Sequence, residues 1–573
     1  MKKMLIPILA VLSAVALAET PKRPMSLVVM WDGARADGIV NAELINLRKL
    51  ASGTWQKGYN GAWSFCGKPI DDARAYSFAN HASIMNGVTR QKHGVTFNHT
   101  SHLCDAKRWP CWLSRLLDAK PGLKAYFSYA CGDHNWATCR DERVAHRDFG
   151  GKDDENAAAL AALYASPDAP DAAVMMFEEP DGIGHVKGFY PMSQEYRKAL
   201  ETCDVRLGKV LDAIAARPTF ADEDWLILVT SDHGGYHTMH GWKDTHSHTT
   251  PIILAGHHVV NGQMAGFPRG QDIAATMLAH FSVDVSGMDL DSIEIGKKAA
   301  SWGPAAKLDD SLVWYYPIVA RTKYLENAVK GGPGSVLFGD EEYFNPKIMK
   351  GRRFATPYLW IGGDEDVPCG ARLNDSVDLF LRPGPAVTLA FWAKTVKREG
   401  RQVLFGNKDF ARAGSPGFVV TSGLHTERTA NGMCLVFATP EGRDEVVGTY
   451  DIEYGEWGFY AVVFTGEGQA WFCQGRKDGC FHWVCARAEN ALLGSGLPLC
   501  IGNDGTGSYK WNYMDFLDDI AVWKRSLTLD ELRCIFKAGL QGRQLKDVVA
   551  LDVRSREARD LMDTTEKAGV VGK

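Results

Sequence analysis

The 573-residue chain lacks three features that would each indicate a different kind of protein. It has no excess of positive charge, because 64 basic residues stand against 69 acidic ones, so we expect no nucleic-acid polymer as a partner. After the N-terminus it has no apolar run of about 18 residues, the length that a membrane span requires. None of its 13 cysteines forms a C-x-x-C pair, a common zinc-finger spacing.

What is present is a globular composition. Hydrophobic residues make up 45% of the chain and charged residues 23%, and the length is sufficient for at least two domains with cores of their own.

The N-terminus reads MKKMLIPILAVLSAVALAET: two lysines, an apolar stretch, then Ala16-Leu17-Ala18 before Glu19. This is the layout of a secretory signal peptide, and the apolar part is short for a membrane anchor. We expect residues 1–18 to be cleaved, which leaves a soluble protein that is secreted or periplasmic.

Cysteines in an exported chain can form disulfides. The odd number leaves at least one unpaired, and Cys203, in a helical stretch, is expected to be a buried free thiol. The pairs that lie close in sequence are the candidates for disulfides: Cys104 with Cys111, Cys131 with Cys139, and Cys473 with Cys480.

The first half, residues 19–300, alternates short apolar runs with helical periodicity. The runs SLVVMW, KAYFSYA, AAVMMF, WLILVTS and PIILAG are typical of buried strands, and helical patterns such as Ser193 to Ala216 lie between them. This alternation predicts a parallel sheet with helices on both faces. Ligands of such sheets bind beyond the carboxyl ends of the strands.

The pattern breaks at residues 301–310, which we interpret as a linker. Residues 311–548 then show many short alternating segments rich in aromatic residues, such as VTLAFWAKT and WGFYAVVFTG, with glycine turns between them. This texture predicts an all-β sandwich. A helical segment, TLDELRCIFKAG, follows the last strand, and residues 549–573 form a charged tail that we expect to be loose.

Carboxylates and imidazoles follow three of the predicted strands. Asp32 comes directly after SLVVMW, Asp181 and His185 follow AAVMMF, and Asp232 and His233 follow WLILVTS. Each residue alone could cap a helix or serve a structural purpose, but together they are the ligand types that a two-metal site needs. Three further histidines follow shortly after: His240, His246 and His248.

A serine and an asparagine stand at a predicted helix start, in the run SFANH. We interpret Ser77 as a nucleophile whose hydroxyl binds a metal ion, while the backbone N–H groups of residues 78–80 face an anion. The side-chain amide of Asn80 would donate to a substrate oxygen as charge develops there. Ser77 could also act as a helix N-cap, and His81 is expected to be structural.

These motifs resemble the alkaline phosphatase superfamily, in particular its type I phosphodiesterase/nucleotide pyrophosphatase branch. The resemblance rests on Asp32, SFANH, PDGIGH, TSDHGG and the HG that follows. The branch has T-F-P-N-H around its nucleophile, so Ser77 replaces threonine and Ala79 replaces proline. Both changes keep the hydroxyl and the asparagine.

The resemblance implies two zinc ions, or other divalent metals in their place. Carried over residue by residue, one ion is held by Asp32, Ser77, Asp232 and His233. The second is held by Asp181, His185 and a further histidine. His240 matches the histidine found in membrane-anchor ethanolamine phosphate transferases of the superfamily, whereas His246 and His248 resemble the one in the mutase branch; we favour His240.

The second half more weakly resembles a laminin G-like, concanavalin A-type sandwich. Such domains often bind glycans or surfaces, so a glycan or cell-surface polymer is a candidate partner, and a purely stabilising sandwich is the alternative. We expect a fragment ending near residue 305 to keep its activity on small soluble esters. The competing possibility is that residues such as Trp314, Tyr315 and Tyr316 pack against the first half as a shared core.

The sequence therefore predicts an exported, zinc-dependent phosphoric ester hydrolase that acts through a phosphoserine intermediate. It leaves open whether the substrate is a diester, a pyrophosphate or a monoester. One alternative is a sulfatase-like hydrolase, although the C/S-x-P-S-R run of sulfatases does not occur around Ser77. The other is a glycan-binding surface protein whose hydrolase half is inert.

Overall fold

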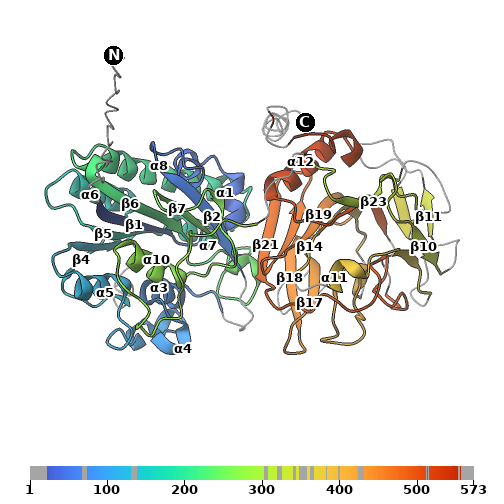
Figure 1. Ribbon diagram of the computed structural model, residues 1–573, viewed down its shortest axis with the longest axis horizontal. Coiled ribbons are helices and arrows are strands. Elements are labelled where there is room, and N and C mark those ends of the chain that lie inside the picture. Colours follow the sequence, from blue (N-terminus) through green and yellow to red (C-terminus); the bar gives the residue numbers. More distant parts are fainter. Residues whose placement is uncertain are drawn as a thin grey trace, which may run out of the picture.

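The computed structural model describes residues 22–67, 74–130, 138–301, 307–318, 325–339, 344–347, 358–361, 367–381, 384–397, 400–423, 432–511, 513, 515–552 and 555. The predicted signal peptide, part of the predicted linker and most of the predicted tail lie outside these residues. Figure 1 shows two halves side by side, an N-terminal α/β half and a C-terminal β half. No helix among the described residues is long and apolar enough to cross a membrane.

The N-terminal half is built on a sheet with the strand order β4-β3-β5-β1-β6-β7-β2-β8. Strands β4, β3, β5, β1 and β6 run parallel to their neighbours. The strands are β1 (Arg23–Trp31), β2 (Asn60–Cys66), β3 (Ala125–Tyr129), β4 (Val144–Asp148), β5 (Ala172–Phe177), β6 (Glu223–Thr230), β7 (Thr250–Gly256) and β8 (Gly262–Gln263).

One strand departs from the predicted parallel arrangement. β7 pairs antiparallel with both β6 and β2. The connection from β6 to β7, residues 231–249, contains only the four-residue helix α9 (Thr245–His248), so no long helix carries the chain back across the sheet. A neighbouring strand that starts at the same edge must run in the opposite direction.

Helices cover both faces of this sheet, as predicted. Leu27 and Val29 of β1 pack in the core beneath α8 (Gln194–Ala215), whereas Val28 and Met30 pack beneath α3 (Ser77–Asn86), α5 (Trp112–Ala119) and α10 (Asp272–His280). The alternation follows from the two-residue period of a strand. The other helices are α1 (Ala36–Asn41), α2 (Ile45–Ala51), α4 (Arg90–His93), η1 (Asn98–Leu103), α6 (Asp153–Tyr164), α7 (Glu179–Lys187) and η3 (Phe220–Asp222).

The C-terminal half is an antiparallel sandwich, which confirms the predicted jelly-roll class. Its sheets have the orders β10-β13-β22-β15-β16-β17-β18 and β11-β12-β23-β14-β19-β20-β21, and β9 pairs with β23. The strands are β9 (Leu312–Tyr316), β10 (Ser335–Phe338), β11 (Phe344–Lys347), β12 (Tyr358–Ile361), β13 (Gly370–Leu373), β14 (Ala386–Lys394), β15 (Gln402–Gly406), β16 (Phe418–Ser422), β17 (Gly432–Ala438), β18 (Asp444–Asp451), β19 (Trp457–Thr465), β20 (Gln469–Gly475), β21 (Phe481–Arg487), β22 (Cys500–Ile501) and β23 (Phe516–Trp523).

The predicted C-terminal helix is α12 (Leu529–Leu540). It begins with a capping box in which the Thr528 side chain accepts from the Glu531 backbone and the Glu531 carboxylate accepts from the Thr528 backbone, which satisfies two N–H groups at the helix start. The short helices of this half are α11 (Asp378–Leu381) and η4 (Leu545–Asp547).

The two halves share an apolar core. Phe65 of β2 lies with its ring 5.1 Å from Trp483 of β21 and 6.4 Å from Trp471 of β20, measured between centroids. The same cluster contains Phe267 from the N-terminal half and Tyr315 from β9. Figure 1 shows β21 beside α1 and β2 at this junction. The outer face of one sandwich sheet is therefore buried partly by the other half of the chain.

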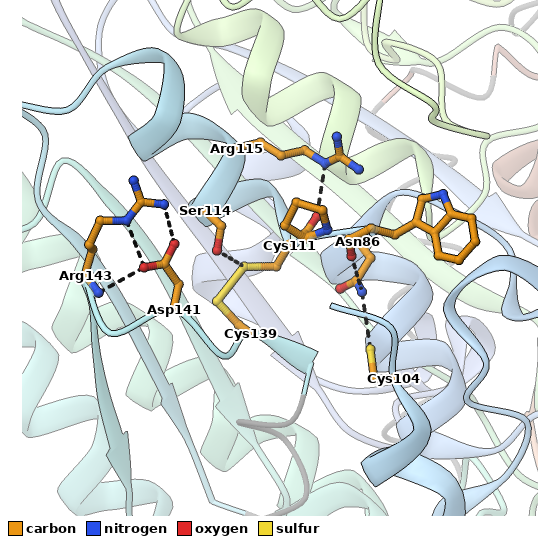
Figure 2. Close-up of a disulfide and its surroundings, with 10 residues drawn as sticks. Asn86, Cys104, Cys111, Ser114, Arg115, Cys139, Asp141 and Arg143 are labelled. Atoms are coloured by element: carbon orange, nitrogen blue, oxygen red, sulfur yellow. Dashed lines mark hydrogen bonds and ion pairs between the residues drawn. A yellow bond between two sulfur atoms is a disulfide. The ribbon is translucent and has the colours of Figure 1, made fainter. Parts of the chain in front are cut away.

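A disulfide joins Cys111, at the start of α5, to Cys139, before β4 (Figure 2). The predicted pairs Cys104–Cys111 and Cys131–Cys139 are therefore wrong, and Cys131 itself lies outside the described residues. Cys104 is a buried free thiol that accepts a hydrogen bond from Asn86, 3.4 Å away. Proximity in the sequence gave the wrong disulfide pairing because α5 and the residues before β4 meet only in the folded chain.

The predicted pair Cys473–Cys480 is also wrong, because both are buried free thiols. Cys473 lies on β20 opposite Trp483, so Cys480 is not its cross-strand neighbour. The expectation for Cys203 is confirmed: it is free and buried on α8.

Candidate functional site

The carboxyl ends of three neighbouring parallel strands bring the predicted polar residues together. Asp32 follows β1, Asp232 and His233 follow β6, and α7 carries Asp181 and His185 directly after β5. Because β5, β1 and β6 are adjacent and parallel, these three segments leave the same edge of the sheet.

The deeper part of the site surrounds one imidazole nitrogen. Nε2 of His233 lies 2.9 Å from Oγ of Ser77, 3.3 Å from Oδ1 of Asp32 and 3.3 Å from Oδ2 of Asp232. Oδ1 of Asp181 is 3.9 Å from the same nitrogen. The side chains of Asp232 and His233 are completely buried, so this group is shielded from water.

The outer part of the site is centred on Asp181. Nε2 of His185 lies 3.3 Å from its Oδ2, and Nε2 of His240 lies 3.7 Å from its Oδ1. The His240 ring stacks on that of His233 with 3.7 Å between centroids, which places the two groups side by side. The His185 side chain is 36% exposed, so this part of the site opens to solvent.

Backbone carbonyls orient all three of these imidazoles. Nδ1 of His233 is 2.7 Å from the carbonyl oxygen of Gly234, Nδ1 of His185 is 2.9 Å from that of Thr238, and Nδ1 of His240 is 3.0 Å from that of Ala75. An imidazole that donates from Nδ1 presents Nε2 as its ligating nitrogen. In each case Nε2 is the nitrogen that faces the carboxylates.

The charges of the site are crowded. Burial, together with the neighbouring carboxylates of Asp232 and Asp181, raises the pKa of Asp32 to about 7. Burial opposes protonation of His233, but Asp232 and Asp32 outweigh it and raise the pKa of that imidazole to about 10. Burial and the neighbouring His233 lower the pKa of His240 to about 4. A protonated His233 thus offsets part of the negative charge of the three carboxylates.

A pair of cations fits this arrangement. Oδ1 of Asp32, Oδ1 of Asp181 and Oδ2 of Asp232 are buried and face imidazole nitrogens at 3.1–3.7 Å, without a well-formed hydrogen bond among the described residues. Two triplets have ligand atoms within 4.8 Å of one another: Asp32 with Asp232 and His233, and Asp181 with His233 and His240. Carboxylate oxygen and imidazole nitrogen are donors that zinc prefers.

His246 and His248 lie elsewhere. His246 is buried beside Arg35, with 3.2 Å between its Nδ1 and a guanidinium nitrogen, and it stacks on Tyr236. His248 lines a cavity next to Asn80, described below. Of the three candidate histidines, His240 is the one that the fold places beside Asp181.

This placement gives a prediction for metal content. His240→Ala should lower the bound zinc from about two ions to about one per chain, because Asp181 and His185 alone make an incomplete set. His246→Ala is the matched control and should keep both ions. Elemental analysis of purified protein, with circular dichroism to verify folding, measures the difference. The reverse order would assign the ligand to His246.

The start of α3 differs from the expectation in two respects. Tyr76 is the N-cap and Ser77 is the first helical residue, so Ser77 does not cap the helix. The backbone N–H of Phe78 donates to Oδ1 of Asn98 at 3.2 Å, and that of Asn80 donates to the carbonyl of Tyr76 at 3.0 Å. These two amides are engaged within the protein, so they do not face an anion as expected.

The Asn80 amide is fixed by two contacts. Its Nδ2 donates to the backbone carbonyl of Asp232 at 2.8 Å, and its Oδ1 accepts from Arg90 at 3.1 Å. One hydrogen of Nδ2 thus holds α3 against the loop after β6. An amide nitrogen carries two hydrogens, so the second is not used by this contact. Arg90 was not found from the sequence, since its role depends on α4 folding back toward α3.

His81 also enters the site, although it was expected to be structural. Its Nε2 lies 3.1 Å from Oδ2 of Asp232 and 3.5 Å from Oδ2 of Asp32. Burial opposes its protonation, but Asp232 raises its pKa above the usual value. The spacing could have revealed this contact, because Ser77 and His81 are four residues apart and share one face of a helix.

The sandwich contacts the ligand-bearing loops through Arg35. This buried guanidinium pairs with Asp37, donates to the carbonyl of Gly235 at 2.8 Å, and lies 5.3 Å from the ring centroid of Tyr450 on β18. Asp37 in turn lies 3.0 Å from Nδ1 of His482 on β21. Arg35 thus connects the loop after Asp32, the loop after His233 and the C-terminal half.

Comparisons with known proteins agree with the motifs. The family model described as type I phosphodiesterase / nucleotide pyrophosphatase matches residues 26–262. The model of the concanavalin A-like lectin/glucanases superfamily matches residues 370–533. No curated protein matches the chain.

Several solved structures are similar at low identity. Inactive murine ectonucleotide pyrophosphatase / phosphodiesterase 5 in complex with AMP is 14% identical over 46% of this chain and 96% of that chain, with a TM-score of 0.35. A 2-O GAG sulfatase is 11% identical over 62% and 86%, with a TM-score of 0.36. The lipoteichoic acid synthase LtaP from Listeria monocytogenes is 11% identical over 49% and 78%, with a TM-score of 0.36.

Proposed function

Because residues 26–262 form a domain of the type I phosphodiesterase / nucleotide pyrophosphatase family, and residues 370–533 a laminin G-like, concanavalin A-like domain, we propose that the protein is an exported, zinc-dependent phosphoric ester hydrolase. The observation that supports this most is the convergence of a serine hydroxyl with buried carboxylates and imidazoles at one sheet edge. Buried carboxylates and imidazoles with strongly shifted pKa values cluster at functional sites.

The ligands divide into the two groups described above. One cation would be held by Asp32, Ser77, Asp232 and His233, and the other by Asp181, His185 and His240. When bound, two divalent cations supply positive charge that favours the serine alkoxide and the departing oxygen of the ester.

Ser77 supplies the nucleophile. Its Oγ gives a proton to solvent and forms a bond to phosphorus as the bond to the leaving oxygen breaks. The leaving alkoxide takes a proton from solvent and departs as the alcohol, which leaves a phosphoserine. Water then cleaves the phosphoserine, releases phosphate or a phosphate monoester, and restores the Ser77 hydroxyl. Nε2 of His233 lies 2.9 Å from Oγ, so both atoms would face the same cation.

Asn80 orients the substrate. Its amide is already positioned by Asp232 and Arg90, so the second hydrogen on Nδ2 can donate to a non-bridging phosphoryl oxygen without further ordering. This contact strengthens as negative charge builds on that oxygen during attack.

A substrate panel tests the proposed function. Purified protein should hydrolyse chromogenic phosphate monoesters or diesters, lose that activity on chelation, and regain it with zinc. Sulfate esters, included because of the sulfatase alternative, should not be cleaved. A zinc-loaded, folded protein that cleaves only sulfate esters, or no ester, would contradict the proposal and favour one of the two alternatives.

The sandwich is proposed to bind a glycan or cell-surface polymer. The outer face formed by β23, β14, β19, β20 and β21 packs partly against α12 and the N-terminal half, so the buried part of that face is not available. A polymer would instead contact the other sheet or the loops, and would raise the local concentration of immobilised substrates.

A further inference from the structure

A cavity of about 330 Å³ lies next to the candidate site, between the two halves of the chain. Asn80 and Asp232 line it on the side of the site, and Phe267 and Arg269 line it from the segment before α10. Arg487, at the end of β21, contributes from the sandwich. The cavity is therefore assembled from both halves and borders residues of the proposed hydrolytic centre.

The lining contains three arginines, Arg90, Arg269 and Arg487, and Asp232 is the one carboxylate among the described residues that line it. Arg269 and Arg487 are each paired with a carboxylate beside the cavity, Asp272 and Glu489. Asp232 belongs to the candidate metal site, so its charge is committed there. We call the cavity defined by these three arginines the arginine pocket.

Hydrogen bonds hold the guanidinium groups of Arg269 and Arg487 in place but do not use all of their N–H donors. Arg269 pairs with Asp272 at 2.8 Å and donates to the Asp291 carbonyl at 2.6 Å. Arg487 pairs with Glu489 at 2.8 Å. Both use Nε and Nη2 for these contacts, and their Nη1 groups make no hydrogen bond to any described residue. The Nη1 groups of Arg269 and Arg487 can therefore still donate hydrogen bonds to an anion.

The position of the third arginine connects the pocket to the chemistry. Arg90 donates to Oδ1 of Asn80, whose Nδ2 holds the carbonyl of Asp232. Asn80 and Asp232 therefore border both the arginine pocket and the candidate site. One substrate molecule can occupy both if its two anionic groups are joined by a short chain.

We propose that the arginine pocket binds a second phosphate group of the substrate, which makes the preferred substrate a small phosphoric ester with two phosphates. This rests on the proposed function. Guanidinium N–H groups form charge-assisted hydrogen bonds with phosphate oxygens, and the Nη1 groups of Arg269 and Arg487 would suit a charged phosphate better than a neutral sugar or base. Because Arg487 belongs to β21, the sandwich contributes directly to the specificity of the hydrolase.

The test compares two inhibitors that differ only in the second phosphate, propane-1,3-diol bisphosphate and propyl phosphate. With the zinc-loaded full chain and bis(p-nitrophenyl) phosphate as substrate, the bisphosphate should inhibit about tenfold more strongly, as expected for added hydrogen bonds between charged groups. Arg487→Gln should remove most of this preference.

Arg443→Gln is the matched control, because Arg443 is an exposed arginine of the same sandwich that does not line the cavity. It should keep the preference for the bisphosphate. Equal inhibition by the two compounds in the wild type, or an unchanged preference in Arg487→Gln, would overturn the proposal.

Calorimetric titration separates this proposal from the proposed function. If the protein binds the bisphosphate in an Arg487-dependent manner but cleaves no ester, the hydrolase assignment fails and the arginine pocket stands. If it cleaves esters but binds both compounds equally, the arginine pocket fails and the hydrolase assignment stands.

Discussion

Ser77→Ala is expected to reduce phosphate ester hydrolysis by at least about a thousandfold, since no other group can replace a nucleophile that forms the covalent intermediate. Ser77 is buried, and its Oγ lies 2.9 Å from Nε2 of His233. Of the seven predicted site residues that hold a metal, it contributes only a neutral hydroxyl. Zinc content should therefore change little, and the loss should fall on kcat.

The matched control is Ser26→Ala. Ser26 is also fully buried, but it lies near the other end of β1 from Asp32, and its hydroxyl makes no hydrogen bond to the described residues. Removing it should leave both activity and zinc unchanged. Steady-state kinetics gives kcat for the two variants, and elemental analysis gives their zinc content. Retention of a tenth or more of wild-type kcat by a folded, zinc-loaded Ser77→Ala protein would exclude Ser77 as the nucleophile.

A fragment that ends near residue 305 is expected to aggregate rather than to act as an independent hydrolase. Its surface would carry Phe65 and Phe267, which the intact chain buries in a cluster with sandwich residues such as Trp483. Arg35 would lose its contact with Tyr450, and Asp37 would lose that with His482. The fragment thus exposes apolar area and disturbs the loops that carry the predicted ligands.

Supplying the missing half tests this expectation. Co-expression with residues 307–552 should recover soluble, zinc-loaded, active protein, whereas the fragment alone should be found in the insoluble fraction. A fragment that is soluble and active by itself would restore the modular reading of the sequence. In that case the sandwich would influence only large or immobilised substrates.

The fold was largely predictable because its strands have distinctive patterns. The runs that became β1, β5 and β6 are short, apolar and followed by polar residues, and the alternation of aromatic residues marked the sandwich. The direction of β7 was not predictable in this way. A short apolar run reads the same in a parallel or an antiparallel strand, and the connection before it determines which forms.

The acidic residues of the candidate site could be predicted because they follow the strands. Asp32, Asp181 and Asp232 were found because neighbouring parallel strands bring their carboxyl ends together. Arg35 and Arg487 could not be found, because their partners come from the other half of the chain and no local pattern encodes that contact. The roles assigned to the site residues remain predictions for the experiments described above.

The disulfide in Figure 2 makes the stability of the folded chain depend on whether its compartment is oxidising or reducing. Cys111 and Cys139 are 28 residues apart, and closing a loop of that length in the unfolded chain lowers its entropy by an amount worth roughly 3–4 kcal/mol at room temperature. In a reducing compartment the disulfide does not form, so this stabilisation is lost. Protein made in a reducing cytosol should accordingly denature at a lower temperature than protein made in an oxidising one, with the difference removed by added reductant.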